Sequence, residues 1–200
     1  SPSRVYTPQL AEQCMETIFI PTVRAMQQEG RPFKGVLYFG LMLTPDGPKV
    51  LEYNARFGDP EAQVVLPRMK NDIIEVVEAC IDGTLDQVDV RWKPGAACCL
   101  VLASGGYPVA YEKGKEITGL ENGQVPGAAD VTVYHAGTAI KDGKLVTNGG
   151  RVLGVTATAA TLPEALKKAY AAADCIHFDK LHRRSDIGAR ALAAMKAQEG

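Results

Sequence analysis

Residues 50–61 read Val50-Leu51-Glu52-Tyr53-Asn54-Ala55-Arg56-Phe57-Gly58-Asp59-Pro60-Glu61 and begin at the end of an apolar run. Alternate side chains of an extended segment leave from the same face, so Glu52, Asn54 and Arg56 are predicted to converge. The carboxylate and the amide carbonyl are hard oxygen ligands for Mg²⁺, and the arginine offers a planar fork for phosphate oxygens. The pattern predicts a nucleotide-phosphate site. The alternative is a strand end whose polar side chains only face water.

The segments around this stretch predict a β-hairpin followed by a helix. Residues 35–44 are almost wholly apolar, which predicts a central strand buried on both faces. Residues 45–48 predict a turn, and the chain then returns as an antiparallel strand that ends at Asn54. Asp59 is predicted to cap the next helix, with Pro60 at its first position and Glu61 in its first turn. Capping is preferred to direct chemistry for these two acids, because helix-start rules already account for both.

Two longer helices are predicted in the first half of the chain. Apolar residues recur at helical spacing from the cap residue Thr7 to Gly30, and Pro21 predicts a kink or a break within that helix. A second helix is predicted over residues 73–82, where Asp72 stands at the capping position.

The second half of the chain has a β-rich pattern. Residues 84–94 are polar and irregular, and they predict a connector between two domains, residues 1–90 and 91–200. A capping box at Thr161 and Glu164 predicts a core-facing helix, and a last helix is expected to begin near Asp186. Short β segments between glycines predict a small antiparallel sheet or half-barrel, and they comprise residues 97–103, 115–120, 131–140, 144–147 and 151–158. The predicted fold class is α+β.

Composition indicates an ordinary globular chain without a charged surface for polyanions. The 200 residues are 46% hydrophobic and 22% charged, with a net charge of −1. A net charge near zero gives no indication of a basic surface that would bind nucleic acid or an anionic membrane. No apolar run approaches the roughly 20 residues of a membrane span. We expect no signal peptide and a cytoplasmic location. Five cysteines without metal-binding spacing are expected to be reduced core thiols, and they are Cys14, Cys80, Cys98, Cys99 and Cys175.

Three more stretches combine polar side chains with glycines, which let a backbone approach a ligand closely. They are residues 104–108 (SGGYP), 135–138 (HAGT) and 147–152 (TNGGRV). Turn chemistry is the alternative for each, because Asn-Gly and Gly-Gly are turn signals in their own right. His177 and His182 lack the spacing of zinc ligands, and the sequence has neither a P-loop nor a G-x-G-x-x-G motif.

These motifs together resemble one enzyme family. Residues 52–61 are similar to the E-[FYL]-N-x-R-F-G-D-P-E signature of glycinamide ribonucleotide synthetase (phosphoribosylamine–glycine ligase), an ATP-grasp family of purine synthesis. The three glycine stretches resemble the family's A-[AS]-x-G-Y-P, F-H-A-G-T and T-x-G-G-R-V motifs, in the same order. The resemblance implies that residues 1–90 form the C-terminal part of an ATP-grasp domain. Residues 91–200 would form the small β-rich C-terminal domain with two helices.

The resemblance also implies an activity and its site residues. The family joins glycine and 5-phosphoribosylamine with hydrolysis of ATP, through a glycyl phosphate intermediate. Glu52 and Asn54 would hold Mg²⁺ or Mn²⁺ between the ATP phosphates, and Arg56 would be the catalytic residue that stabilises charge on the transferring phosphoryl group. In the second domain Arg151 would contact the phosphate of phosphoribosylamine. The residues implied to line the same cleft are His135, Thr138 and Asn148.

The sequence departs from the wider pattern in two places. Many ATP-grasp enzymes carry a second acid on the preceding strand, whereas here Gly40 stands near that position, so metal binding relies on Glu52 and Asn54. The family's N-terminal domain and adenine-binding portion have no counterpart ahead of Ser1, so that part is the expected partner. The chain alone is expected to be inactive. The alternative function is a non-catalytic folding or interaction module derived from an ATP-grasp ligase.

Overall fold

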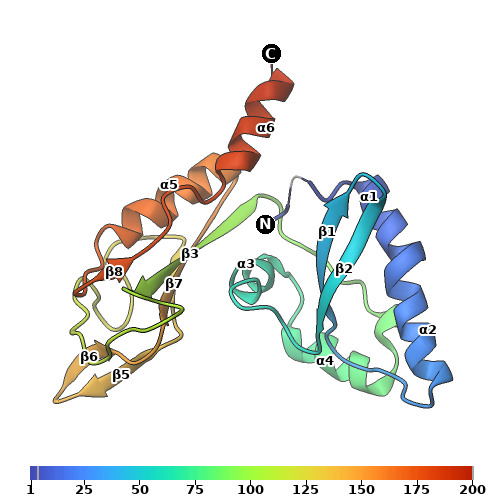
Figure 1. The fold of residues 1–200 in the computed structure, drawn as a ribbon, viewed down its shortest axis with the longest axis horizontal. Helices are drawn as coiled ribbons and strands as arrows, with labels where there is room; N and C mark the ends of the chain where they lie inside the picture. Colours follow the sequence, from blue (N-terminus) through green and yellow to red (C-terminus); the bar gives the residue numbers. More distant parts are fainter. Residues whose placement is uncertain (4, 200) are drawn as a thin grey trace. The chain divides into compact units, whose positions relative to one another are not determined.

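The computed structural model describes residues 1–3 and 5–199, with helices and antiparallel sheets that confirm the predicted α+β class (Figure 1). Contacts divide the chain into two compact units. The hairpin unit comprises Ser3–Glu61 and Met69–Trp92, and the sheet unit comprises Ser1–Pro2, Ala62–Arg68 and Lys93–Gly200. The expected domain boundary between residues 90 and 91 stays a prediction.

The hairpin unit begins with a helical segment in three parts, α1 (Pro8–Cys14), the π-helical turn η1 (Met15–Phe19) and α2 (Ile20–Gln28). Thr7 is the predicted N-cap, since its hydroxyl accepts the N–H of Leu10 at 3.2 Å. The kink or break expected at Pro21 takes the form of the π turn that precedes it. A proline ring clashes with the carbonyl four residues earlier in an α-helix, and the wider turn relieves this clash.

The predicted hairpin is present as β1 (Tyr38–Thr44) and β2 (Gly47–Asn54). The Thr44 hydroxyl stabilises its turn, donating to the Gly47 carbonyl at 2.8 Å and accepting the Asp46 N–H at 3.2 Å. Among the described residues β1 pairs only with β2, and the side chains of Met42 and Leu43 are 50% and 47% exposed. The prediction of a central strand buried on both faces is therefore wrong for this chain. An apolar run indicates burial only where another layer covers it.

One face of the hairpin packs on the helical segment. The ring centroids of Phe19 and Phe39 lie 4.4 Å apart, and those of Phe39 and Tyr53 lie 5.3 Å apart. Side chains alternate across a strand, so Glu52 and Asn54, next to Tyr53 in the chain, point to the opposite face. The face with the predicted metal ligands therefore points away from the helical segment.

The segment after the hairpin differs from its prediction. The next helix, α3 (Ala62–Val65), begins later than expected, and Asp59, Pro60 and Glu61 form a turn ahead of it. Asp59 is therefore not the N-cap, and Pro60 is not the first helical residue. A contact that local helix-start rules do not consider competes here, because the Tyr38 hydroxyl donates to Glu61 Oε1 at 3.2 Å. A 3₁₀ turn, η2 (Leu66–Arg68), follows α3.

The last helix of the hairpin unit is α4 (Ile73–Asp82), followed by the 3₁₀ turn η3 (Leu85–Gln87). Asp72 caps α4 as predicted, accepting the N–H of Ile74 at 2.9 Å. Its apolar side chains are nevertheless largely exposed, with Ile74 at 59% and Ile81 at 64%.

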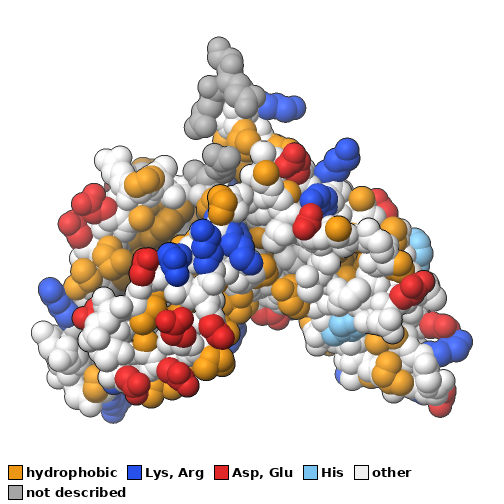
Figure 2. Space-filling model, turned by 180° about the vertical axis from the view of Figure 1, so that it is seen from behind, with side chains coloured by type: hydrophobic (Ala, Val, Ile, Leu, Met, Phe, Trp, Pro, Cys, Tyr) orange, Lys and Arg blue, Asp and Glu red, His pale blue; other side chains and the backbone are white. Residues whose placement is uncertain are grey.

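The hairpin unit buries little of its apolar surface. Within the described part of the chain, its buried hydrophobic residues are Cys14, Ile18 and Ala79. Figure 2 shows hydrophobic side chains exposed over this unit, on the left of the view. Contiguous exposed apolar surface is unusual for a self-contained domain and is typical of an interaction surface.

The sheet unit is organised around a four-stranded antiparallel sheet in the order β4-β7-β3-β8. Two of the strands predicted from the sequence do not form as expected. Residues 115–120 make only isolated bridges, and residues 131–140 are divided by a turn at Ala136 and Gly137. Its strands are β3 (Ala96–Ser104), β4 (Val131–His135), β7 (Arg151–Ala159) and β8 (Leu181–His182), with the hairpin β5 (Thr138–Lys141) and β6 (Lys144–Thr147) beside them in sequence.

Helix α5 (Leu162–Ala173) packs on this sheet, and α6 (Ala189–Glu199) follows it, so the two predicted helices are present. The capping box of α5 is confirmed, with the Glu164 N–H donating to the Thr161 hydroxyl at 3.4 Å and the Thr161 N–H to Glu164 Oε2 at 3.2 Å. The fully buried core side chains of this unit include Leu100, Leu102, Val152, Leu153, Val155 and Ile176.

None of the five cysteines forms a disulfide bond in the described part of the chain, and four of them are buried or half-buried. Cys175 is exposed, so the expectation that every cysteine is a core thiol is wrong at this position. Burial raises the pKa of the Cys98 thiol to about 11, which keeps it protonated. None of the helices in the described ranges is long and apolar enough to cross a membrane.

The difference in burial predicts unequal protection from hydrogen exchange. Backbone amides of β3 and β7 should exchange slowest, because most of their side chains are buried, whereas β1 and β2 have no buried side chain. Hydrogen-exchange mass spectrometry of residues 1–200 measures both pairs in one experiment. Equal protection of the two pairs would contradict this prediction.

Candidate functional site

The predicted metal ligands lie side by side at the end of β2. Asn54 Nδ2 donates to Glu52 Oε1 at 3.2 Å, which leaves the amide oxygen of Asn54 and the second oxygen of Glu52 available. Glu52 is exposed and Asn54 is half-buried. The hydrogen bond fixes the orientation of the amide, so that two hard oxygen donors are presented together.

Gly40 makes room for Glu52. The two residues pair across the hairpin, and a Cβ added to Gly40 would lie only 2.8 Å from Glu52 Cγ. No acid could stand at position 40 without displacing Glu52. The departure from the wider ATP-grasp pattern therefore has a steric reason in this chain.

Arg56 does not share the extended geometry of the other two residues. β2 ends at Asn54, and Ala55 and Arg56 form a bend, so the prediction that three side chains leave one face of a single extended segment is wrong for Arg56. Its Nη1 donates to the carbonyl of Phe57 at 2.8 Å. The position of the guanidinium therefore depends on the loop after the strand.

The donor set fits Mg²⁺ or Mn²⁺, because a carboxylate and an amide oxygen are ligands that these ions accept. In residues 1–3 and 5–199, no group of three or more His, Cys, Asp or Glu side chains is arranged to hold a metal ion. A site with two protein ligands suits an ion that keeps water and substrate phosphates as its remaining ligands.

Two residues that sequence reasoning did not assign to the site lie beside it. Tyr38 pairs with Asn54 across the hairpin, and its hydroxyl donates to Glu61 Oε1 at 3.2 Å. Burial, with the neighbouring carboxylates of Glu61 and Glu52, raises the pKa of the Tyr38 phenol, so this hydroxyl is a donor at neutral pH. The contact spans 23 residues in sequence, and no local pattern could have indicated it.

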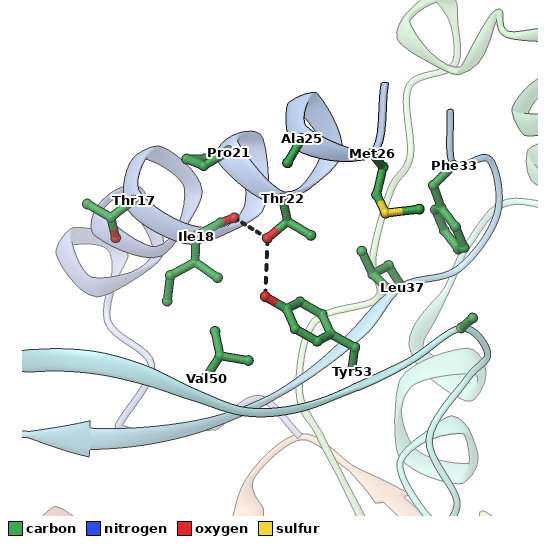
Figure 3. A pocket seen from close by; sticks show the side chains of 11 residues that line it. Thr17, Ile18, Pro21, Thr22, Ala25, Met26, Phe33, Leu37, Val50 and Tyr53 are labelled. Atoms are coloured by element: carbon green, nitrogen blue, oxygen red, sulfur yellow. Dashed lines mark hydrogen bonds between the residues drawn. The ribbon is translucent and has the colours of Figure 1, made fainter. Parts of the chain in front are cut away.

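The opposite face of the hairpin forms an apolar cavity of about 700 Å³ against the helical segment (Figure 3). Tyr53 points into it, with its hydroxyl 3.5 Å from that of Thr22, which donates to the Ile18 carbonyl at 2.7 Å. The lining contains Val50 and Leu37 but neither Glu52 nor Asn54. This cavity is thus separate from the predicted metal ligands.

In the sheet unit, the three glycine stretches come together. Gly137 packs on Gly149, since a Cβ added to Gly137 would lie 2.8 Å from the Gly149 Cα. The Asn148 N–H donates to the Gly137 carbonyl at 2.7 Å, which joins the second stretch to the third. Such close backbone approach requires glycine at both positions.

The first glycine stretch joins the third through Ser104 and Tyr107, which sequence reasoning did not assign. The buried Ser104 hydroxyl donates to the Gly149 carbonyl at 2.8 Å, and the Ser104 N–H donates to the Gly150 carbonyl at 2.8 Å. The Tyr107 ring lies against Gly150, where an added Cβ would meet a ring carbon at 2.1 Å. The turn before Arg151 is therefore held from two sides.

The predicted substrate residues line these turns. His135 Nε2 donates to the Gly123 carbonyl at 3.1 Å, since a carbonyl only accepts, and Nδ1 lies within hydrogen-bond distance of the Thr138 hydroxyl, at 3.1 Å. Asn148 is exposed, and the half-buried Arg151 begins β7 opposite Ala103. The structure thus gathers all four residues in one unit, and their contacts with substrate stay predictions.

The steric argument at Gly40 gives a test of the metal ligands. Gly40→Ala should displace Glu52 and weaken Mn²⁺ binding in the presence of ATP by about 10–100-fold, the range for disturbing groups that orient a metal ligand. Mn²⁺ titration followed by electron paramagnetic resonance measures this. Met42→Ala, on the same strand, is the control and should leave the affinity unchanged. Equal Mn²⁺ affinity of Gly40→Ala and wild type would remove Glu52 from the metal site.

Two family models match most of this chain. The phosphoribosylglycinamide synthetase ATP-grasp (A) domain matches residues 1–62, and the C domain of the same enzyme matches residues 97–190. The phosphoribosylamine–glycine ligase of Vibrio parahaemolyticus is 49% identical over 194 residues, which cover 96% of this chain and 44% of the relative. That of Mesorhizobium japonicum is 48% identical over 197 residues, 98% of this chain and 46% of the relative.

Solved structures agree with these relatives. The phosphoribosylamine–glycine ligase of Thermotoga maritima matches 93% of this chain and 44% of its own, with 39% identity and a TM-score of 0.80. The biotin carboxylase domain of Hydrogenobacter thermophilus 2-oxoglutarate carboxylase, in complex with MgADP, covers 92% of this chain and 39% of its own. At 17% identity and a TM-score of 0.61, it shares the fold alone.

This chain spans less than half the length of the ligases it matches. The two family models, together with relatives close to half identical over nearly all of the chain, show that it belongs to the phosphoribosylglycinamide synthetase family.

Proposed function

We propose that this chain is the C-terminal part of a phosphoribosylamine–glycine ligase, which joins glycine to 5-phosphoribosylamine and hydrolyses ATP. The proposal includes Mg²⁺ or Mn²⁺ as the metal, ATP as the co-substrate and a cytoplasmic location. Its main support is the pair of Glu52 and Asn54, whose Oε1 and Nδ2 atoms lie 3.2 Å apart on the face of the hairpin opposite the helical segment, in a chain of this family.

The hairpin unit would carry the phosphoryl-transfer chemistry. Glu52 and Asn54 would hold the divalent ion, which when bound neutralises charge on the ATP phosphates. Arg56 would stabilise negative charge on the phosphoryl group as it moves to glycine to form glycyl phosphate. Because the side chain of Arg56 is exposed, it can reach a phosphate once the loop is in place.

The sheet unit would bind phosphoribosylamine. Arg151 would contact its phosphate, since a guanidinium forms charge-assisted, bidentate hydrogen bonds with phosphate oxygens. Asn148, His135 and Thr138 lie on the same group of turns and would contact the remaining polar groups of this substrate.

The chain would need the preceding part of the enzyme for activity. Phosphoryl transfer requires donors on both sides of ATP, and this chain spans 44% of the Vibrio parahaemolyticus ligase. The exposed apolar side chains of the hairpin unit favour the second candidate function, a non-catalytic folding or interaction module.

A completed enzyme tests the proposal, with residues 1–200 joined behind the N-terminal part of the Vibrio parahaemolyticus ligase. We expect ADP release that depends on glycine and phosphoribosylamine, and no such release from residues 1–200 alone. A folded completed enzyme without this activity would contradict the ligase assignment. Mg-ATP binding to the isolated chain, measured by calorimetry, would argue against the second candidate.

Glu52→Gln in the completed enzyme should lower turnover at limiting Mg²⁺ by about 10²–10³-fold, because it keeps the shape but removes charge from the metal site. The thermal midpoint should change little, since an exposed carboxylate contributes at most about 1 kcal/mol. Glu78→Gln, at an exposed position of α4, is the matched control. Unchanged turnover, or a stability loss large enough to explain the lower activity, would count against Glu52 as a ligand.

Arg151→Ala in the completed enzyme should raise KM for phosphoribosylamine by about 10–100-fold, the range for losing a charged hydrogen bond, and change KM for ATP far less. Steady-state kinetics with each substrate varied in turn measure both constants. Arg190→Ala, on the exposed surface of α6, controls for the loss of positive charge. A larger effect on ATP than on phosphoribosylamine would move Arg151 to another role.

A further inference from the structure

A hydrogen bond from the neighbouring strand β1 holds the far end of the loop that carries Arg56. The chain leaves β2 after Asn54 and returns at Glu61, whose Oε1 accepts from the Tyr38 hydroxyl at 3.2 Å. Tyr38 is the first residue of β1 and pairs with Asn54 across the hairpin. The far end of the loop is therefore tied to the strand next to the point where the loop begins.

Gly58, inside this loop, allows Glu61 to take that position. Gly58 is buried, and a Cβ added there would lie 2.4 Å from Glu61 Oε2 and 2.9 Å from its Cδ. The Glu61 carboxylate thus lies over the loop backbone while it contacts Tyr38. Both groups are partly buried, so this hydrogen bond to a charged acceptor competes less with water than an exposed one does.

We propose that Tyr38 and Glu61 are positioning residues that hold the loop from Ala55 to Pro60, and with it Arg56, in the arrangement needed for phosphoryl transfer. The inference rests on the proposed function of Arg56. The Arg56 guanidinium donates to Phe57 of the same loop, so its location follows the loop. A displacement of about 1 Å can lower a rate by about 10²-fold, which makes such a closure important for catalysis.

The opposing interpretation is that Glu61 is a further metal ligand. Conservative substitutions distinguish a positioning role from metal binding, because they change the charge and the hydrogen bond separately. Glu61→Gln keeps an oxygen that accepts from Tyr38 but removes the charge, whereas Glu61→Ala removes the acceptor and Tyr38→Phe removes the donor. Positioning predicts that Tyr38→Phe resembles Glu61→Ala and that Glu61→Gln is closer to wild type than either of them. Metal binding predicts that Glu61→Gln is impaired and that Tyr38→Phe is not.

The test uses these three variants and the double variant Tyr38→Phe/Glu61→Ala in the completed enzyme. We expect Tyr38→Phe and Glu61→Ala each to lower kcat about 10–100-fold, the value of a hydrogen bond to a charged group. Glu61→Gln should lower kcat by less than either of these variants, because its neutral amide oxygen still accepts a weaker hydrogen bond. The double variant should be no worse than the worse single variant, because both substitutions remove one contact. Mn²⁺ affinity, measured by electron paramagnetic resonance, should be unchanged in all four.

Hydrogen exchange in residues 1–200 provides a readout that does not depend on activity. Tyr38→Phe should speed exchange of residues 55–61 at least several-fold and leave the amides of β1 and β2 unchanged. Tyr53→Phe is the matched control, since its hydroxyl lies on the opposite face of the hairpin, 3.5 Å from Thr22. This control should change neither loop exchange nor kcat.

Three outcomes would overturn the proposal. These are weaker Mn²⁺ binding in Glu61→Gln, unchanged loop exchange in Tyr38→Phe, and faster loop exchange with unchanged kcat in an active completed enzyme. If the completed wild-type enzyme lacks ligase activity, the function proposed above fails, and the exchange experiment still decides whether Tyr38 and Glu61 close the loop.

Discussion

Both candidate sites depend on contacts that are possible only where a Cβ atom is missing. In the hairpin unit Gly40 gives space to Glu52, and Gly58 gives space to the Glu61 carboxylate. In the sheet unit Gly137 and Gly149 pack backbone against backbone, and a tyrosine ring lies on Gly150. A side chain at these positions would displace a functional group or separate two loops. The space left by the missing Cβ atoms therefore determines where the polar side chains of both sites lie.

The parts of the fold that follow from local rules could be predicted from sequence. The hairpin, the Thr7 cap and the Thr161 capping box each depend on a few neighbouring residues, and the structure contains all of them. Burial of residues 35–44 could not be predicted, because an apolar strand looks the same whether or not another layer covers it. The prediction that a helix starts at Asp59 was wrong, because local rules do not consider the hydrogen bond that Tyr38, outside the segment, donates to Glu61.

The candidate site divides in the same way. The proximity of Glu52 and Asn54 follows from the two-residue period of a strand, so sequence indicated it. Arg56 lies beyond the end of that strand, where the period no longer applies. The hydrogen bond from Ser104 to Gly149 joins residues that are 45 apart in the chain, and the pairing of strands β3 and β7 brings them together. The side-chain period of a strand predicts which ligands lie together on that strand. The residues that hold these ligands in place come from distant parts of the chain, and only the tertiary structure shows them.

The π-helical turn at Met15–Phe19 affects which way the following helix faces. The Ile20 N–H reaches back five residues to the Met15 carbonyl, so this turn holds one residue more than an α-helical turn. Each residue of an α-helix advances the side-chain direction by about 100°. Removing a single residue from the turn would restore regular α-helical geometry, but it would also restore the clash between the Pro21 ring and the carbonyl four residues earlier. It would rotate Pro21, Thr22 and Ala25 away from the hairpin as well, so the apolar cavity would lose part of its lining.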